Sequence, residues 1–477
     1  MNIICATDIN LGIGYKNELP WHIKEDLQYF NKLTTKKGEN GEKPIVVMGH
    51  NTWLSLPEKH RPLKDRENIV ISGLNEIKNV IRYKNFEYFL EDYGKTIELR
   101  KTPIWIIGGA DLYRTAIIKS YLIKKIYLTL INKKYEVDRY MTEIGPEFYI
   151  KNYKIIENCM DSKIQKEVKI TFLELEYDMS YLEKTNNFSE KRYLQYLRKI
   201  INGGEERLDR TGIGTKSILG SQYRYDLTNK RIPLLTTKKM YWKGIVEELL
   251  WFLKGQTNSK ILEDKKVNIW KGNSSKEFLE SRGLAYEEGD IGPGYGFSFR
   301  HWGAEYKDCK TDYTGQGVDQ FQNLINNINN DPYSRRHIID LWNPKELNNM
   351  ALPPCHILYQ FYVSHNGTKL SCSMYQRSGD MGLGVPFNIA SASLMTILVA
   401  KLTGLEPYEL VHTVGDTHIY TNHIEPLKEQ ILRKPYFFPI IEFNNEKEYK
   451  NIEDFEYNDI KLIGYISHPP VKMDMAV

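Results

Sequence analysis

The stretch Ile104–Ala110 (IWIIGGA) decides the fold of the first third of the chain. It is an apolar run of strand length that breaks at Gly108-Gly109 into a helix starting at Ala110. Because glycine lacks a Cβ, the free amides at the start of that helix can approach a pyrophosphate closely. Strand-to-helix turns often use glycine in any case, and no G-x-G-x-x-G follows a strand here, so the turn alone is weak evidence for a nucleotide site.

Short apolar runs and helical patterns alternate on both sides of this turn. The alternation predicts an α/β domain with a mixed, mostly parallel central sheet and flanking helices. The expected strands are Asn2–Thr7, Pro44–Met48, Asn68–Ser72, Ile104–Ile107, Lys125–Leu130 and Thr171–Tyr177. The expected helices are Lys24–Leu33, Tyr83–Tyr93 and Ala110–Ile118.

The pattern changes after Tyr177. Residues 178–192 are polar and charged without a sustained period, which predicts a short linker between a first domain, 1–177, and a second, 193–477. Longer helices and β-rich segments follow, and they predict an α+β domain. The expected helices are Tyr193–Ile201, Met240–Lys254 and Phe387–Leu402; the expected strands are Arg336–Trp342, Ile357–Ser364 and Lys369–Gln376.

Composition restricts the class of protein. The chain has 477 residues and a net charge of +4, which is not the footprint of a dedicated nucleic-acid-binding protein. The start, MNIICATDIN, does not resemble a signal peptide, and the longest apolar stretch, Ile389–Ala400, is too short to cross a bilayer. Five widely spaced cysteines form neither a disulfide framework nor a zinc pattern. We therefore expect a cytoplasmic protein without a metal, a membrane or a nucleic-acid partner.

The helix expected at Lys24–Leu33 places a carboxylate on an apolar face. Because residues three and four apart share a helix face, Asp26 lies with Ile23, Phe30 and Leu33 on the side that faces the core. A buried carboxylate needs a hydrogen-bonding ligand or a raised pKa. The alternative is an ordinary aspartate at a helix start, which stabilises the helix dipole.

An ordered set of motifs runs from Ile3 to about Tyr177, and together they resemble dihydrofolate reductase. The motifs are Ile4–Ala6, Gly14–Trp21, Asp26-Leu27 with Phe30, Met48–Trp53, Arg61–Leu63 with Arg66, Asn68–Ser72, Ile107–Gly109 with Tyr113, and Tyr127–Thr129.

The resemblance implies reduction of dihydrofolate with NADPH. Asp26, with Thr129, would hydrogen-bond the pteridine and assist its protonation, and Arg66 would bind the folate α-carboxylate. Ile4, Ala6 and Phe30 would complete the folate site, with Phe30 packed on the folate. The resemblance implies an NADPH site made of Ala6, Ile13, Leu19, Trp21, Gly49, His50, Thr52, Ser72, Gly108, Gly109 and Tyr113. Leu19 and Trp21 would lie on a mobile loop over the nicotinamide.

The chain departs from this family where the 2′-phosphate of NADPH is held. Basic residues are common after the position of Gly49 and after Ser72, but here those positions are His50, Asn51 and Gly73. Arg82 or Lys84 is the candidate replacement, and the choice between NADPH and NADH stays open.

One cysteine of the second part has basic neighbours. Cys355 lies in Ala351–His356 (ALPPCH), between two β-like segments, and a lone cysteine is most often a small buried hydrophobe. Two basic clusters, Arg335-Arg336 and Gln376–Ser378, stand in mostly apolar segments. Guanidinium groups suit phosphate, and nearby cations favour a thiolate, although arginine pairs are also common on surfaces.

A second carboxylate lies on an apolar helix. Glu248 shares a face with Ile245 and Phe252, on a helix that should end at Gly255. This placement suggests an acid–base or water-organising group, and the alternative is a paired structural glutamate.

The second part, from about Tyr193 to Val477, resembles thymidylate synthase. The motifs occur in the order Asp209–Thr215, Leu235–Lys239, Glu247–Phe252, Asp331–Arg336, Leu352–His356, Tyr375–Ser391 and Gly415–His423.

This resemblance implies methylation of dUMP with 5,10-methylenetetrahydrofolate. The Cys355 thiolate would add to C6 of dUMP, which makes C5 a nucleophile toward the one-carbon unit. Glu248 would organise the water for proton transfers, Tyr295 would lie close to the reacting carbon, and His356 completes the catalytic set.

Binding roles follow from the same resemblance. Arg210, Arg377 and Ser378 would hold the dUMP phosphate, with Arg335 and Arg336 reaching in from the partner of a homodimer. Asn388 would read the uracil edge, His418 and Tyr420 the ribose 3′-hydroxyl, and Gln376 and Asp380 would complete the nucleotide site. The implied folate site contains Trp270, Asn273, Asp380 and Ala476, with 473–477 closing over the complex. Three departures, Lys271, Gly294 and Ala392, surround these regions and leave the folate affinity open.

A reductase followed by a synthase is similar to the bifunctional enzymes of plants and protists, in which the dihydrofolate made by one activity is the substrate of the other. Two alternatives remain. One is an active synthase with a weak or inactive reductase; the other is a nucleotide- or RNA-binding regulator without turnover.

Overall fold

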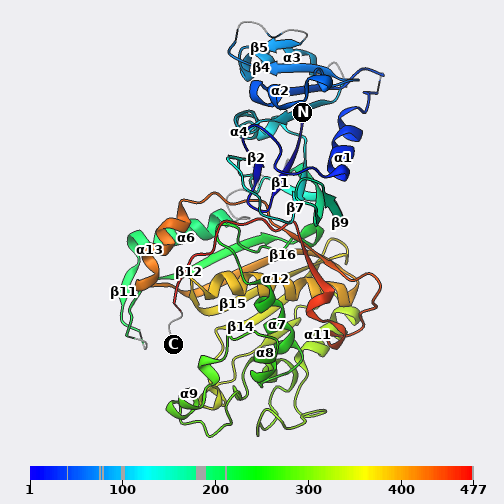
Figure 1. The fold of residues 1–477 in the computed structure, drawn as a ribbon. Helices are drawn as coiled ribbons and strands as arrows, with labels where there is room; N and C mark the ends of the chain where they lie inside the picture. The colour runs from blue at the N-terminus through cyan, green and yellow to red at the C-terminus, as the bar shows by residue number, and fades with distance from the viewer. Residues whose placement is uncertain are drawn as a thin grey trace. The chain divides into compact units, whose positions relative to one another are not determined.

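The computed structural model describes residues 1–477 except 40, 75, 76, 78, 79, 98–101, 179–189, 210, 211 and 475–477. The chain divides into two compact units, Met1–Tyr181 and Leu182–Val477, and each is described by itself (Figure 1). Arg210, Ala476 and most of the expected linker 178–192 lie outside the described residues.

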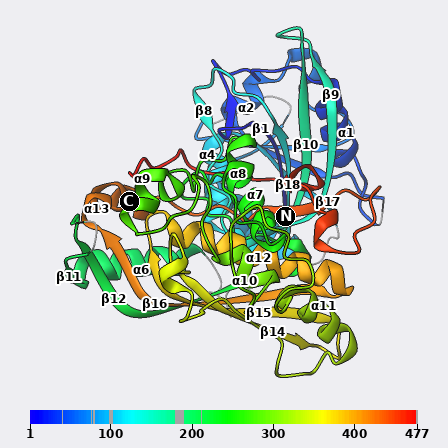
Figure 2. The ribbon, with the colours of Figure 1, turned by 90° about the horizontal axis from the view of Figure 1, so that it is seen from below.

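The first unit is built on an eight-stranded sheet. In spatial order its strands are β5 (Ile81–Tyr83), β4 (Glu67–Ile71), β3 (Ile45–Gly49), β6 (Ile104–Gly108), β1 (Asn2–Asp8), β7 (Lys125–Ile131), β10 (Lys166–Tyr177) and β9 (Phe148–Asp161). From β5 to β7 all neighbours are parallel, and β10 and β9 add an antiparallel hairpin at one edge (Figure 2). The predicted mixed, mostly parallel sheet is confirmed.

The parallel strands are buried on both faces, as their continuous apolar runs require. The helices are α1 (Lys24–Thr34), α2 (His50–Ser55), α3 (Phe86–Ile97) and α4 (Ala110–Ile118), and a two-stranded ribbon joins β2 (Gly12–Gly14) to β8 (Arg139–Tyr140). Strand β6 leads through Gly109 directly into α4, so the turn that the sequence predicted is present.

The second unit contains a six-stranded sheet. Its order is β11 (Glu205–Arg207), β12 (Thr215–Asp226), β16 (Glu406–Tyr420), β15 (Lys369–Asp380), β14 (His356–Ser364) and β13 (Ile338–Asp340). Only the central pair, β15 and β16, is parallel in this sheet. A separate antiparallel pair is formed by β17 (Ile440–Phe443) and β18 (Ile460–Ile463).

Helices account for most of the remaining core. They are α6 (Glu190–Gly203), α7 (Trp242–Leu253), α8 (Lys260–Asp264), α9 (Lys276–Ser281), α10 (Tyr295–Arg300), α11 (Gln320–Asn330), α12 (Gly384–Thr403) and α13 (Ile424–Ile431). Helix α12 packs along β15 and β16 (Figure 1). By length and composition α12 could cross a membrane, but 72% of its most apolar window is buried inside the unit, so it reads as the core helix that its all-round apolar surface predicts.

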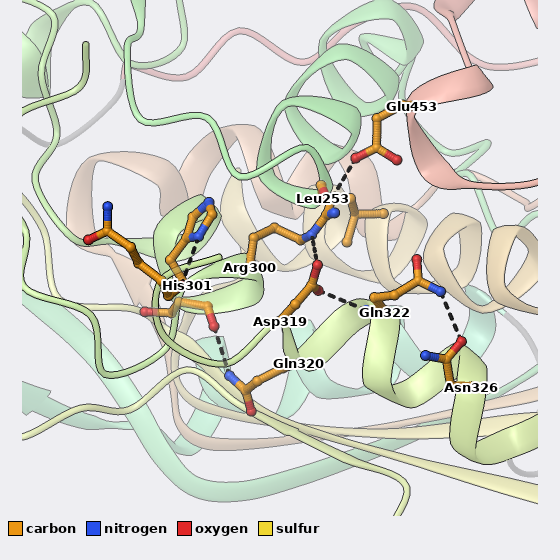
Figure 3. Close-up of polar contacts among 10 residues, drawn as sticks. Leu253, Arg300, His301, Asp319, Gln320, Gln322, Asn326 and Glu453 are labelled. Atoms are coloured by element: carbon orange, nitrogen blue, oxygen red, sulfur yellow. Dashed lines mark hydrogen bonds and ion pairs between the residues drawn. The ribbon is translucent and has the colours of Figure 1, made fainter. Parts of the chain in front are cut away.

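Arg300 joins three helices of the second unit (Figure 3). From the end of α10 it donates to Asp319 Oδ2 (2.9 Å), which precedes α11, and to the carbonyl oxygen of Leu253 (2.9 Å), which ends α7. It also donates to Glu453 Oε1 (2.7 Å). Because α7 carries Glu248 and α10 begins at Tyr295, these bonds fix the relative position of two predicted site residues.

Some expected boundaries were wrong. The helix expected at Tyr83–Tyr93 begins at Phe86, because Tyr83 belongs to β5 and Asn85 Oδ1 accepts the Tyr88 amide in the manner of an N-cap. The strand expected at Arg336–Trp342 is restricted to Ile338–Asp340. Three long strands, β9, β12 and β16, were not expected, because charged and polar residues interrupt their apolar alternation.

Candidate active sites

A cleft of about 870 Å³ opens in the first unit. Most residues of the predicted folate and NADPH sites line it: Ile4, Ala6, Ile13, Leu19, Asp26, Phe30, Gly49, His50, Thr52, Ser72, Gly108, Gly109 and Tyr113. They come from β1, α1, α2 and the segments around β2, β4 and β6, which lie far apart in sequence. The fold therefore gathers the predicted residues around one cavity.

Asp26 is the buried carboxylate of this cleft. It lies in the first turn of α1 and is 8% exposed, and the Thr129 hydroxyl hydrogen-bonds it from β7. Burial raises the pKa of Asp26 from 3.8 to about 6, and the bond from Thr129 limits the rise. Of the two interpretations of Asp26, the structure supports the buried carboxylate, because its side chain lies in the cleft and is shielded from water.

The Gly108-Gly109 turn packs closely against Thr52 and leaves no room for larger side chains. A Cβ at Gly109 would lie 3.1 Å from Thr52 Oγ1, and one at Gly108 would lie 3.3 Å from the same atom. Tyr113, one turn into α4, donates its hydroxyl to the carbonyl oxygen of Ile4 (2.8 Å), which ties α4 to β1. Backbone amides at the start of α4 and the absence of side chains here suit a pyrophosphate, so these residues fit a dinucleotide such as NADPH.

Three predicted residues lie away from the cleft wall. Thr129 is buried behind Asp26. Arg66 donates to Thr34 Oγ1 (2.8 Å), and its guanidinium carbon lies 5.9 Å from the centre of the Phe30 ring. Trp21 is 2% exposed and packs edge-on against Tyr135 (5.3 Å between ring centres), so in this structure Leu19, and not Trp21, faces the cleft.

The two candidate replacements for the missing basic residues differ in position. Lys84 lines the cleft together with His50, Asn51 and Gly73, and it is exposed. Arg82 does not line it, and its Nε donates to the carbonyl oxygen of Ser72 (3.2 Å).

In the second unit, Cys355 lies just before β14 and is partly exposed. Its backbone amide donates to the hydroxyl oxygen of Tyr295 (2.7 Å), the first residue of α10. The Tyr295 ring stacks on the His356 ring, with 4.4 Å between their centres. The predicted nucleophile and two further predicted catalytic residues therefore form one cluster.

Arg377 supplies positive charge beside this cysteine. Its guanidinium donates to the carbonyl oxygens of Pro354 (2.8 Å) and Pro353 (3.2 Å), and one of its nitrogens lies 3.9 Å from Cys355 Sγ. A cation at this distance favours the thiolate form of a cysteine.

The other four cysteines are in a different environment. Burial is the main cause that raises the thiol pKa of Cys5, of Cys159 to about 11, and of Cys309 and Cys372 to about 12. These thiols stay protonated at neutral pH, which makes them poor nucleophiles. The interpretation of Cys355 as an inert buried hydrophobe does not fit its partial exposure and its arginine neighbour.

Glu248 lies on α7 facing the same cluster. Burial raises its pKa from 4.5 to about 7, and a hydrogen bond from Trp270 Nε1 to Oε1 (2.7 Å) opposes the rise. The His356 imidazole has its pKa lowered to about 3 by burial, so it is neutral, and its Nδ1 lies 2.6 Å from the Tyr359 hydroxyl. At neutral pH Glu248 can therefore both give and take a proton.

Gln376 and Asn388 are joined directly. Gln376 Nε2 donates to Asn388 Oδ1 (3.0 Å) and to the carbonyl oxygen of Ser378 (2.9 Å). Gln376 Oε1 lies 2.9 Å from Nε2 of His412, a buried residue of β16 that sequence reasoning missed.

His418 lies opposite Asp380 in the register of β16 and β15. Its Nδ1 lies 3.0 Å from Asp416 Oδ1, and its ring centre is 5.4 Å from that of Tyr420. Asp380 accepts the Gly382 amide (2.7 Å). Burial would raise the pKa of Asp380, but hydrogen bonds from His423 and Gly382 bring it below its ordinary value.

The remaining residues of the predicted synthase site, and the three departures from the family pattern, differ in exposure. Arg335 and Arg336 are exposed before β13, Asn273 is partly exposed and Lys271 is exposed, whereas Gly294 and Ala392 are buried. Arg210 and Ala476 lie outside the described residues.

Two further residues near Asp380 were also missed. Lys238 is buried and donates to the carbonyl oxygen of Gly382, and burial lowers its pKa to about 8. His423 Nε2 contacts the carbonyl oxygen of Asp474 (2.7 Å) and so holds the C-terminal segment. Both residues belong to motifs of the sequence, but only the fold shows what they contact.

Within the described residues, no group of three or more His, Cys, Asp and Glu side chains is placed to hold a metal ion.

Comparison with known proteins gives a consistent result for both units. The family model for dihydrofolate reductase matches residues 1–177, and that for thymidylate synthase matches residues 191–477. Among curated relatives, the bifunctional dihydrofolate reductase-thymidylate synthase of Leishmania major is 41% identical over 502 residues, covering 100% of this chain and 95% of the relative. Those of Zea mays and Paramecium tetraurelia are 41% and 43% identical, again over 100% of this chain, with 96% and 98% of the relative covered.

The chain therefore belongs to the bifunctional dihydrofolate reductase–thymidylate synthase family: its first part is the NADPH-dependent oxidoreductase, and its second part is the methyltransferase that uses 5,10-methylenetetrahydrofolate.

Proposed function

We propose that Asp26 is the acid of the reductase site. When bound, NADPH supplies the hydride, and the chain's own task is to hold the pterin and deliver a proton to it. A carboxyl group with a pKa of about 6 in a buried, apolar setting is protonated often enough near neutral pH for this task. Thr129 fixes the orientation of the carboxyl, and Ile4, Ala6 and Phe30 line the cavity around it.

The cofactor end of the cleft binds NADPH through backbone and small residues in this proposal. The amides at the start of α4, next to Gly108-Gly109 and Thr52, hold the pyrophosphate. Lys84 contacts the 2′-phosphate in place of the basic residues that the family often has, which is supported by its position on the cleft wall. Arg66, beside Phe30, binds the folate α-carboxylate.

In the synthase site we assign Cys355 as the nucleophile. Its thiolate, favoured by Arg377, forms a bond from Sγ to C6 of dUMP, and the electron pair of the C5–C6 bond becomes available at C5 for attack on the one-carbon unit. Glu248 exchanges protons with the base through water, and Tyr295 and His356 shape the pocket at the reacting carbon. The observation that supports this most strongly is the Cys355–Arg377–Tyr295 cluster.

The nucleotide is bound by residues around this cluster. Arg210, Arg377 and Ser378 take the phosphate, His418 and Tyr420 the ribose, and Asn388 the uracil edge, with Gln376 behind it. Trp270, Asn273, Asp380 and Ala476 contact the folate.

The test uses 5-fluoro-dUMP, in which the hydrogen that must leave C5 is replaced by fluorine. With methylenetetrahydrofolate present, intact-mass spectrometry should find one adduct per site, and peptide mapping should place it on Cys355. An adduct on another residue, or none with active enzyme, would contradict the assignment.

The synthase unit forms a homodimer in this proposal. One face of its six-stranded sheet exposes large apolar side chains: Tyr362 is 67% exposed, Ile338 is 43% exposed and Tyr375 is 41% exposed. The register places Leu358 opposite Tyr375 and Ile338 opposite Gln360, so these side chains form one surface across β13, β14 and β15. A contiguous apolar patch on an enzyme typically marks an interface, and a second copy would bring its exposed Arg335 and Arg336 to the phosphate.

Complementation tests the shared site. In a mixture of Cys355→Ser and Arg336→Ala chains, a mixed dimer contains one site with both Cys355 and Arg336 intact. Activity should rise above that of either variant after subunit exchange. No recovery, with exchange verified by mass, would mean that the phosphate arginines act within their own chain.

We also infer that a short linker joins the two domains and that the enzyme acts in the cytoplasm. The linker was expected at 178–192, but residues 190–192 form the first turn of α6, so the linker ends before Glu190. The two family models leave 178–190 unmatched. No disulfide bond joins any of the five cysteines, all of which belong to the described part of the chain, and this is typical of a reducing compartment.

A further inference from the structure

A network of three polar side chains, two of them buried and the third, Asn388, partly exposed, runs from β16 to α12. His412 is fully buried and Gln376 is 1% exposed, and their 2.9 Å contact is followed by the 3.0 Å contact from Gln376 to Asn388. Sequence reasoning gave roles to Gln376 and Asn388 but none to His412.

The orientation of all three side chains in this network follows from one backbone carbonyl. The Ser378 oxygen can only accept, so the Gln376 atom 2.9 Å away from it must be the amide nitrogen. Gln376 Oε1 then faces His412, and because an amide oxygen only accepts, His412 Nε2 must carry the proton. The second N–H of Gln376 faces Asn388, which must present Oδ1 to it.

The state of the imidazole supports this order. Burial, with a smaller contribution from His356, lowers the pKa of His412 to about 3, so the ring is neutral and has one N–H group. No hydrogen-bond partner is present for Nδ1 within the described part of the chain, which is compatible with a bare nitrogen there and a proton on Nε2.

We propose that His412 is a positioning residue for base recognition: through Gln376 it holds the Asn388 amide in the orientation that accepts uracil and rejects cytosine. The proposal rests on the assignment of Asn388 to the uracil edge. Uracil offers an acceptor, O4, beside a donor, N3–H, whereas cytosine offers a donor, the 4-amino group, beside the acceptor N3. To bind cytosine, Asn388 would have to exchange Oδ1 and Nδ2, which would set its N–H groups against the N–H of Gln376.

His412 contributes to this discrimination because Gln376 has two anchors. The Ser378 carbonyl fixes its nitrogen, and His412 fixes its oxygen. Without the histidine donor, Oε1 is buried without a partner, and the amide loses one of the two bonds that resist its rotation.

The experiment measures kcat/KM of the full-length enzyme for dUMP and for dCMP in His412→Phe, which keeps the ring and removes the donor. The dUMP to dCMP ratio should fall roughly tenfold, which is the effect expected when a buried group loses one partner. His412→Gln, which restores an N–H donor at a similar reach, should recover most of the ratio. The chemical-denaturation midpoint of thymidylate formation, compared with that of the parent enzyme, reports that the second unit, which contains His412, is folded.

The double variant distinguishes the proposed role of His412 from the assignment of Asn388 to the uracil edge, on which that role rests. If His412 acts through Asn388, His412→Phe should not change the ratio further in an Asn388→Ala background. A ratio unchanged by His412→Phe, with Asn388→Ala reducing it, would overturn the role of His412 alone. A ratio unchanged by Asn388→Ala would overturn the assignment of Asn388 to the base.

Discussion

The backbone amide of Cys355 donates a hydrogen bond of 2.7 Å to the hydroxyl oxygen of Tyr295. The bond joins the segment that carries the nucleophile to the start of α10. Because the tyrosine oxygen accepts this bond, its own proton is available to donate toward a ligand at the reacting carbon.

Replacing Tyr295 by Phe should therefore reduce the synthase rate. The Cys355 amide loses its partner and the nucleophile loses a fixed position, which we expect to lower kcat by roughly tenfold or more. Steady-state kinetics should show the loss in kcat more than in KM for dUMP. An unchanged kcat would mean that neither the bond to the Cys355 amide nor the tyrosine proton contributes to catalysis.

Cys355→Ser should abolish thymidylate formation and leave dihydrofolate reduction intact. A serine hydroxyl is not ionised at neutral pH and cannot replace the thiolate. Cys309→Ser is the matched control, because Cys309 is partly exposed in the same unit but has a thiol pKa raised to about 12. Comparable loss in both variants would point to general damage and not to a nucleophile.

Asp26→Asn should abolish dihydrofolate reduction while thymidylate formation continues. It should also stabilise the first unit at neutral pH. Because the pKa of Asp26 is about 6 in the folded state and 3.8 in the reference state, the folded state binds more protons between these values, and stability falls as pH rises through that interval. The asparagine variant escapes this loss, so above pH 7 it should gain about 2–3 kcal/mol in free energy of unfolding.

Calorimetry at pH 4 and pH 8 measures this difference. The variant and the parent should unfold at nearly the same temperature at pH 4, and the variant at a higher temperature at pH 8. The opposite sign would show that Asp26 is stabilised as a carboxylate by its surroundings.

Lys84→Met should weaken NADPH binding and leave NADH binding unchanged, because only NADPH has a 2′-phosphate for the ammonium group to contact. An exposed contact of this kind should raise KM for NADPH by roughly fivefold, and by less at high salt. Arg82→Met is the control, because Arg82 does not line the cleft. Equal effects on both cofactors would remove Lys84 from the phosphate site.

Arg300→Met should destabilise the synthase unit by about 2–3 kcal/mol, because two carboxylates and the Leu253 carbonyl lose their shared donor (Figure 3). The loss should appear in chemical denaturation as a lower midpoint for thymidylate formation than for dihydrofolate reduction. Arg282→Met, at an exposed position of the same unit, should change neither midpoint.

The sequence predicted those parts of the fold whose signal is local. The apolar run before Gly108-Gly109 and the helix after it could be read from spacing, and so could the buried faces of α1 and α7. Strand β16 could not be predicted in this way. Its sequence mixes polar and apolar residues, and its pairing with β12 and β15 becomes visible only in the fold.

The candidate sites show the same division. Asp26, Glu248 and Cys355 stand out because a carboxylate on an apolar face or a thiol near arginines is chemically unusual. His412 gives no such signal, since a histidine in a strand is ordinary until the parallel pairing of β15 and β16 brings it to Gln376.

The most direct test of the central claim follows folate absorbance in one preparation of the enzyme. With dUMP and methylenetetrahydrofolate, dihydrofolate should accumulate, and NADPH added afterwards should consume it. Dihydrofolate that persists after NADPH is added would contradict an active reductase, and a failure to form dihydrofolate at all would contradict an active synthase.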